Sequence, residues 1–154
     1  MKYLLERWND LIINEPDKYD VAGAIAKKEV INAIEVTKNM NANVDPTELF
    51  SEKSADFLHL KPADVESIIG NYDFANLSGI GLMFVVESFN KINEQASVYV
   101  AFIDLSSGQI IFTERVQAAP RGFGMRNYWA GAIFEMLSKM KKKEFELWRR
   151  KYAR

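Results

Sequence analysis

Three strand-like runs joined by short links, between residues 80 and 117, constrain the fold more than any other part of the sequence. Residues 81–89, 98–105 and 109–117 can each be divided into two alternating faces, as the side chains of a β-strand are. Ser106-Ser107-Gly108 has the composition of a tight hairpin turn. Two short links in succession predict an antiparallel meander. Because both faces of the first run are mostly apolar, we expect it to be the central strand, covered on both sides.

Helical patterns flank this region. Apolar residues at helical spacing predict a short helix within residues 3–14, and Asp20 is a candidate cap for a second helix that begins near Val21. The stripe of that second helix extends to Thr37, with a strand within 29–36 as the alternative. Asp45-Pro46 predicts a helical turn through Phe50.

Two further helices complete the pattern. Pro62 suits the first turn of a helix that Gly70 ends. After Gly124, apolar side chains recur at a spacing close to 3.6 as far as Tyr152, which predicts one long helix. The sequence therefore predicts an α+β fold: a single domain over residues 1–154, with helices packed on a three- or four-stranded, mainly antiparallel sheet.

The residue inventory limits the chemistry. The chain has 154 residues, no Cys and one His. These counts exclude disulfides, thiolate nucleophiles and sites built from several Cys or His ligands. We expect no metal, no cofactor and no catalytic residue, and we interpret His59 as a packing residue rather than a base.

Charge is unevenly distributed along the chain. Residues 139–154 hold eight basic and two acidic side chains, whereas the rest holds 12 basic and 19 acidic ones. We interpret this basic C-terminal helical extension as a solvated helix face. Contact with nucleic acid or an anionic membrane is the less favoured alternative. No apolar run is long enough to span a membrane, and acidic and basic residues interrupt the N-terminal apolar stretch, so we expect a soluble chain that carries no leader as given.

The glycine-rich turn before the last helix is the first candidate site. Gly122 and Gly124 permit unusual backbone conformations, the helix start offers free N–H groups, and Arg121 and Arg126 add two cations. These are the ingredients of a phosphate or carboxylate site. The alternative is that the glycines only allow a tight turn.

Glu87 is the second candidate, because it is an acid in the middle of an apolar strand. A buried carboxylate needs a cation or hydrogen-bond donors, and we expect a structural ion pair between Glu87 and Arg126. The alternative role is that of a general acid with a raised pKa in a hydrolase.

The Gly-Phe-Gly-x-Arg-Asn-Tyr-Trp string at residues 122–129, with the meander and Trp8-Asn9-Asp10-Leu11-Ile12, resembles a group of uncharacterised α/β proteins of Bacteroides-type bacteria. The resemblance implies an envelope-associated protein, periplasmic if a leader was removed.

From all of these features we expect a non-catalytic binding or scaffolding domain that acts through a protein partner or a homodimer, since an open sheet edge can recruit another chain. The alternative is a small-ligand module at the glycine-rich turn.

Overall fold

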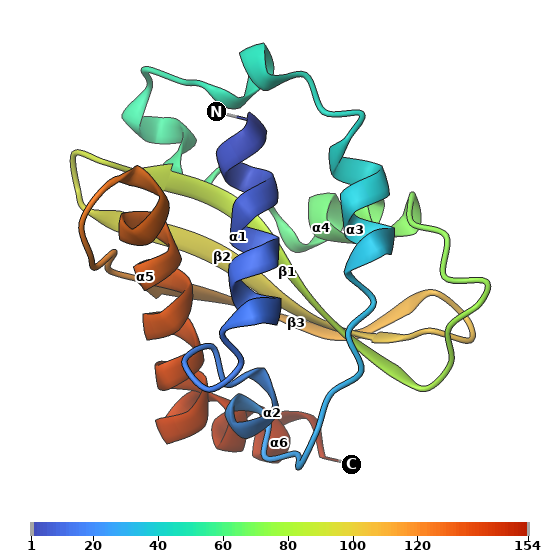
Figure 1. The fold of residues 1–154 in the computed structure, drawn as a ribbon. Coiled ribbons are helices and arrows are strands. Elements are labelled where there is room, and N and C mark those ends of the chain that lie inside the picture. The colour runs from blue at the N-terminus through green and yellow to red at the C-terminus, as the bar shows by residue number, and fades with distance from the viewer. Residues whose placement is uncertain (1, 154) are drawn as a thin grey trace. The chain divides into compact units, whose positions relative to one another are not determined.

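The computed structural model describes residues 2–153, and the side chains of α1 from Glu6 onward. It confirms the α+β class, with three antiparallel strands in one open sheet (Figure 1). The strands are β1 (Ile80–Asn90), β2 (Gln95–Asp104) and β3 (Gln109–Ala118). The α-helices are α1 (Lys2–Asn14), α2 (Val21–Ala24), α3 (Ile34–Asn41), α4 (Pro62–Gly70), α5 (Met125–Lys139) and α6 (Phe145–Tyr152). Single helical turns are η1 (Pro46–Leu49), η2 (Ser54–Leu58) and the π-helical η3 (Met140–Glu144).

The chain divides into two compact units. The helical unit combines Met1–Ile34 with Ala118–Arg154, and the sheet unit is Glu35–Gln117. A single domain over residues 1–154 therefore stays a prediction.

In the sheet unit, the strand order is β1-β2-β3. The meander is confirmed, but the prediction that the first strand is central was wrong, because β2 holds that place. β2 is buried on both faces, by Val98 and Val100 on one and Tyr99 and Ala101 on the other. β1 is an edge strand that exposes Ile80. Apolar residues on both faces predict burial of the faces, and they say nothing about whether both backbone edges are paired.

Helix α4 packs on one face of this sheet. Its buried residues Val65 and Ile69 share a core cluster with Tyr99, Ala101 and Ile103 of β2. Pro62 begins the helix and Gly70 ends it, as predicted.

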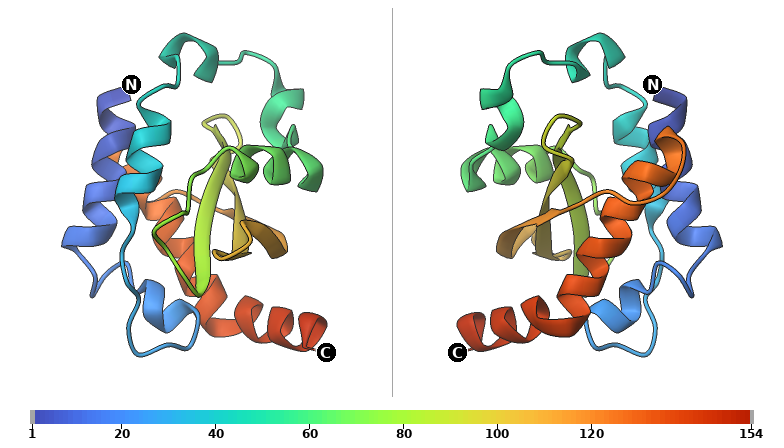
Figure 2. Two further views of the ribbon diagram at one scale, coloured as in Figure 1. Left: turned by 90° about the vertical axis from the view of Figure 1, so that its right-hand side faces the viewer. Right: turned by 90° about the vertical axis from the view of Figure 1, so that its left-hand side faces the viewer.

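In the helical unit, α1 lies alongside α5 (Figure 2). The indole Nε1 of Trp8 donates a 2.8 Å hydrogen bond to the backbone oxygen of Arg126, which fixes α1 to the first turn of α5. The side chain of Asp20 caps α2, as predicted, by accepting from the backbone N–H of Gly23 at 2.8 Å.

The second predicted helix is much shorter than expected. It ends at Ala24, and residues 25–33 form neither a helix nor a strand before α3 begins. Ala26 has a positive φ of 53°, which an α-helix does not admit. The side-chain oxygen of Asn32 then accepts from the N–H of Ile34 and starts α3. The local backbone conformation at Ala26 and the side chain of Asn32 therefore end one helix and start the next, although the apolar stripe continues between them.

The C-terminal helical run extends from Met125 to Tyr152, with η3 between α5 and α6. Chain preceding α5 folds back against it: the N–H of Arg121 donates to the backbone oxygen of Tyr128 at 3.1 Å. A Cβ on Gly131 would lie 2.0 Å from the backbone oxygen of Arg121, so this close approach requires glycine.

Candidate functional site

Glu87 occupies an irregularity in β1. Val86 pairs with Val98, and Ser88 pairs with Ser97, so Glu87 is an extra residue that has no paired residue on β2. Such a β-bulge redirects the side chain it carries. The Glu87 side chain is fully buried.

Four donors surround the Glu87 carboxylate. Oε1 accepts from the N–H of Leu60 at 2.7 Å and from Arg115 Nη2 at 3.0 Å. Oε2 accepts from Ser97 Oγ at 2.7 Å and from Arg115 Nε at 3.0 Å. The guanidinium therefore bonds to both carboxylate oxygens, and this two-point contact is the strongest form of an arginine–carboxylate pair. The guanidinium carbon also lies 4.7 Å from the ring centre of Tyr99.

The same cluster anchors the segment that enters α4. The backbone oxygen of Leu60 accepts from Tyr99 Oη at 3.0 Å and from Arg115 Nη2 at 2.6 Å, while its N–H donates to Glu87. Burial raises the pKa of Tyr99 above its usual range, so its hydroxyl stays a donor at neutral pH. Both backbone polar groups of one residue are thus bonded by side chains of the sheet. The carboxylate of Glu87 is thus engaged by donors at both of its oxygens.

The cation that holds Glu87 is Arg115 of β3, whereas the sequence pattern led us to expect Arg126 in that role. The physical reason is that the side chain of Arg115 reaches over Tyr99, across the width of β2, to the bulge. Arg115 is the one basic residue within the three strands, and this was the sequence signal that could have found it. Arg126 belongs to the other unit, and its direct pairing with Glu87 stays a prediction.

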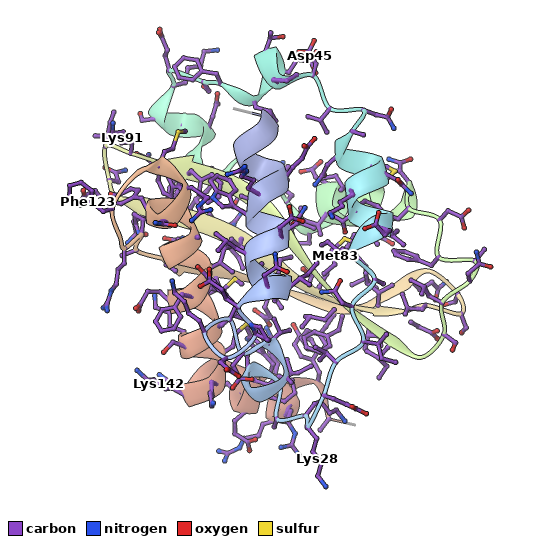
Figure 3. All side chains as sticks on the ribbon, in the orientation of Figure 1. Lys28, Asp45, Met83, Lys91, Phe123 and Lys142 are labelled. Carbon is purple, nitrogen blue, oxygen red and sulfur yellow. The ribbon has the colours of Figure 1, made fainter. Side chains whose placement is uncertain are left out.

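The four residues of the glycine-rich turn lie as follows. Gly122 and Gly124 have φ values of 114° and 77°, which confirms their special backbone conformations. Arg121 Nε pairs with Glu135 of α5 at 3.1 Å, and Arg126 Nε donates to Asn127 Oδ1 at 3.2 Å. Between the glycines, Phe123 points away from the chain and is 95% exposed (Figure 3).

A hollow of about 320 Å³ lies between α1 and the start of α5, and Arg126 lines it with Arg7. Asp10 and Glu15 line it as well. The two cations thus face two carboxylates, and the site is electrically balanced rather than positive.

The sheet unit exposes an unusual surface segment at residues 44–58, which we name the acidic–apolar segment. Four large apolar side chains are exposed in it: Val44, Leu49, Phe50 and Leu58. Four acidic residues accompany them, with one basic residue, Lys53. The acidic residues are Asp45, which caps η1 and is labelled in Figure 3, with Glu48, Glu52 and Asp56. The sequence pattern predicted only the helical turn here, because exposure cannot be read from composition.

The helical unit exposes the opposite charge. Seven basic side chains of residues 139–151, the basic helix end, are exposed: Lys139, Lys141, Lys142, Lys143, Arg149, Arg150 and Lys151. Lys141 pairs with Asp20 at 2.8 Å, and Arg149 and Arg150 both pair with Glu146 at 3.2 and 3.1 Å. Within the described residues Lys142 and Lys143 form no ion pair, and Lys142 projects from the helix (Figure 3).

His59 is exposed, and its Nδ1 lies 2.7 Å from the backbone oxygen of Asp56. Across residues 2–153, no three His, Asp or Glu side chains are grouped in a way that could hold a metal ion. None of the helices in this part of the chain is long and apolar enough to cross a membrane.

No family model matches this chain, and no curated protein or solved structure matches it either. The resemblance to envelope-associated proteins, and the location that it implies, therefore stay predictions.

Proposed function

We propose that this chain is a non-catalytic protein-binding domain and that the acidic–apolar segment is its binding surface. The observation that carries the proposal is the exposure of Phe50 at 68% and of Leu49 at 48%, in one segment with the exposed side chains of Val44 and Leu58. Exposed apolar side chains gathered in one short segment and surrounded by polar groups are typical of protein interaction sites. The aromatic ring of Phe50 supplies the large buried area that an interface needs.

The charges of the segment define the partner. Four acidic side chains against one basic one favour a positively charged surface, and the apolar side chains require apolar groups within it. A helix with lysine or arginine on its flanks and apolar residues along one stripe satisfies both conditions. The proposed ligand is therefore a basic amphipathic helix.

The engagement of Glu87 supports a non-catalytic role. A general acid must exchange its proton with a substrate, and this carboxylate holds Arg115, Ser97 and the N–H of Leu60 instead. Breaking those contacts would leave buried polar groups without partners. The hydrolase alternative therefore has no reacting group at this position.

Binding of a designed amphipathic peptide tests the proposal. The probe is a helix of leucine and lysine of about 18 residues, roughly five turns, and its control is a scrambled peptide of the same composition. We expect fluorescence anisotropy to show salt-sensitive binding of the helical peptide to the full chain. Replacement of two apolar side chains, Leu49→Ser with Phe50→Ser, should weaken it at least about tenfold, since each buried apolar side chain is worth roughly 1.5–3 kcal/mol.

A matched double variant controls for the loss of apolar surface as such. Ile31 and Ile92 are 95% and 89% exposed and lie outside the segment. Ile31→Ser with Ile92→Ser should leave peptide binding unchanged. Equal binding by the scrambled peptide, or equal losses in the two double variants, would reject the segment as the binding surface.

A second candidate function is small-ligand binding in the hollow beside Arg126. The specific observation is that Arg7 of α1 lines the same hollow, together with Asp10 and Glu15. Its charges suit a ligand that bears both an anionic and an ammonium group. Thermal stabilisation by phosphoethanolamine but not by inorganic phosphate, lost in Arg126→Gln, would support this function, and the absence of any shift would reject it.

A further inference from the structure

We infer that the natural occupant of the acidic–apolar segment is the basic helix end of a second copy of this chain. The inference rests on the proposed function and names its partner. Two copies would associate through two equal contacts, each joining the basic helix end of one copy to the acidic–apolar segment of the other.

Charge separation between the two units is the first argument. The helical unit holds 15 basic and 9 acidic side chains, a net charge of +6, whereas the sheet unit holds 5 basic and 12 acidic ones, a net charge of −7. The near-neutral total of −1 hides this separation. Two copies therefore attract each other when the helical unit of one faces the sheet unit of the other.

Side-chain chemistry of the basic helix end is the second argument. Leu147 and Tyr152 of α6 are exposed, and the exposed basic residues Arg149, Arg150 and Lys151 lie between them in the sequence. The basic helix end therefore offers the acidic–apolar segment both exposed apolar groups and exposed cations. Lys142 and Lys143, on η3, form no ion pair within the described residues and are available to a partner carboxylate.

The pairing of two arginines with Glu146 favours a protein partner over a polyanion. Glu146 holds both Arg149 and Arg150, at 3.2 and 3.1 Å, and so limits the freedom of two planar guanidinium groups. Glu146 also reduces the net charge that a nucleic acid or an anionic membrane would meet.

The assembly that we propose is a two-fold dimer. Each copy carries one basic and one acidic surface, and the proposed two-fold dimer occupies both surfaces of both copies at once. A two-fold dimer leaves neither surface free for a third copy. We therefore expect a dimer rather than a growing filament.

Charge exchange in the full chain tests the inference. The acid-swapped variant carries Glu48→Lys and Glu52→Lys, and the base-swapped variant carries Lys142→Glu and Lys143→Glu. All four side chains are exposed, and none has an ion-pair partner within the described residues, so neither variant removes a native contact. Light scattering and analytical ultracentrifugation give the mass of each variant alone and of an equimolar mixture.

The native chain should have about twice its monomer mass of 17.7 kDa at low salt, and its dissociation constant should rise at least about tenfold when salt screens the contact. Each swapped variant alone should be a monomer at low salt. Their mixture should form a heterodimer, because the lysines of one then face the glutamates of the other. Recovery of association in the mixture is a result that a simple loss of folding in either variant cannot produce.

Two matched variants carry the same charge changes elsewhere, on exposed residues of the helical unit: Lys27→Glu with Lys28→Glu, and Asp17→Lys with Glu29→Lys. Both should dimerise like the native chain. A native chain that is monomeric at low salt, or swapped variants that do not associate with each other, would overturn the inference. So would a basic helix end that binds duplex DNA or anionic vesicles while the chain stays a monomer.

The proposed function and this inference fail in different ways. If the designed peptide binds the acidic–apolar segment but the swapped variants do not associate, the segment binds another protein and the second copy is rejected. If the peptide does not bind and the swapped variants do not associate, the proposed function fails as well.

Discussion

Each unit contains a carboxylate bonded to a cation, and the two pairs differ in their surroundings. In the sheet unit, Glu87 is fully buried and accepts from four donors, and the Arg115 side chain is 30% exposed. In the helical unit, the side chains of Asp20 and Lys141 are 41% and 60% exposed. Removing one partner of the buried pair leaves buried polar groups without hydrogen-bond partners. Removing one partner of the exposed pair only returns the other partner to water. Burial, rather than the identity of the charged groups, decides what such a pair contributes.

The largest expected effect is in the buried pair. Glu87→Ala removes the acceptor of Arg115, Ser97 and the N–H of Leu60, so we expect a loss of about 3 kcal/mol in the free energy of unfolding. Urea denaturation followed by circular dichroism measures it. Glu66→Ala, at an exposed position of α4, should change stability by less than about 0.5 kcal/mol. Equal losses in the two variants would show that the donors around Glu87 contribute nothing.

The helical unit depends on close backbone packing where the sheet unit depends on a buried charge. Gly131→Ala places a Cβ against the backbone oxygen of Arg121, and the resulting shift should cost about 2 kcal/mol, more than alanine contributes as a helix former. Thermal denaturation measures the loss. The control is Gly70→Ala, which meets no atom within 4 Å and should be neutral or slightly stabilising. A stabilising Gly131→Ala would contradict the packing of the turn on α5.

Within the Glu87 cluster, Tyr99→Phe removes the phenolic hydroxyl and keeps the aromatic ring. It removes the donor to the backbone oxygen of Leu60 and should cost about 1 kcal/mol. Because the pKa of Tyr99 is raised by burial, its contribution is complete below the unfolded pKa of about 10 and is lost as the pH rises through the folded pKa. Denaturation between about pH 8 and 11 should therefore show a weaker alkaline decline in the variant. An unchanged decline would exclude Tyr99 as its source.

The smallest effect is expected in the exposed pair. The hydrogen bond from Lys141, followed by that from the N–H of Gly23, lowers the pKa of Asp20. Asp20 therefore contributes stability above its unfolded pKa of about 4, and this contribution is lost as the pH falls through the lower folded pKa. Solvent screens the pair, so Lys141→Ala should cost less than about 1 kcal/mol at neutral pH. The difference from the native chain should shrink at high salt and below pH 4, and a constant difference would contradict an electrostatic origin.

Local patterns in the sequence predicted most of the sheet unit. Alternating apolar residues located the meander, and Pro62 and Gly70 marked both ends of α4, because each pattern reflects a local physical requirement. The β-bulge at Glu87 could not be predicted, since it depends on how β1 and β2 align. The partner of Glu87 depends on that bulge as well. Arg115 lies two strands further along the chain, on β3, so no local pattern connects it with Glu87.

The candidate site was harder to predict than the fold. Exposure of Phe50 depends on what the rest of the chain leaves uncovered, which no local pattern encodes. The basic residues after Lys139 were visible in the sequence, but which of them are already paired was not: Glu146 engages Arg149 and Arg150, and Asp20 engages Lys141 across a long stretch of sequence. The net charge of the sequence thus located the basic surface. Only the structure identified which of its side chains are available to a partner.

The π-helical turn η3 has a consequence for how the chain tolerates changes in length. Met140 and Trp148 are both buried although they lie eight positions apart, one more than the seven positions after which an α-helix returns to the same face. A wide turn absorbs one surplus amino acid without rotating the next helix about its axis. Deleting any one of Lys141, Lys142 or Lys143 should therefore convert the run into an uninterrupted α-helix that still buries Trp148, whereas adding a residue there would turn the indole toward water.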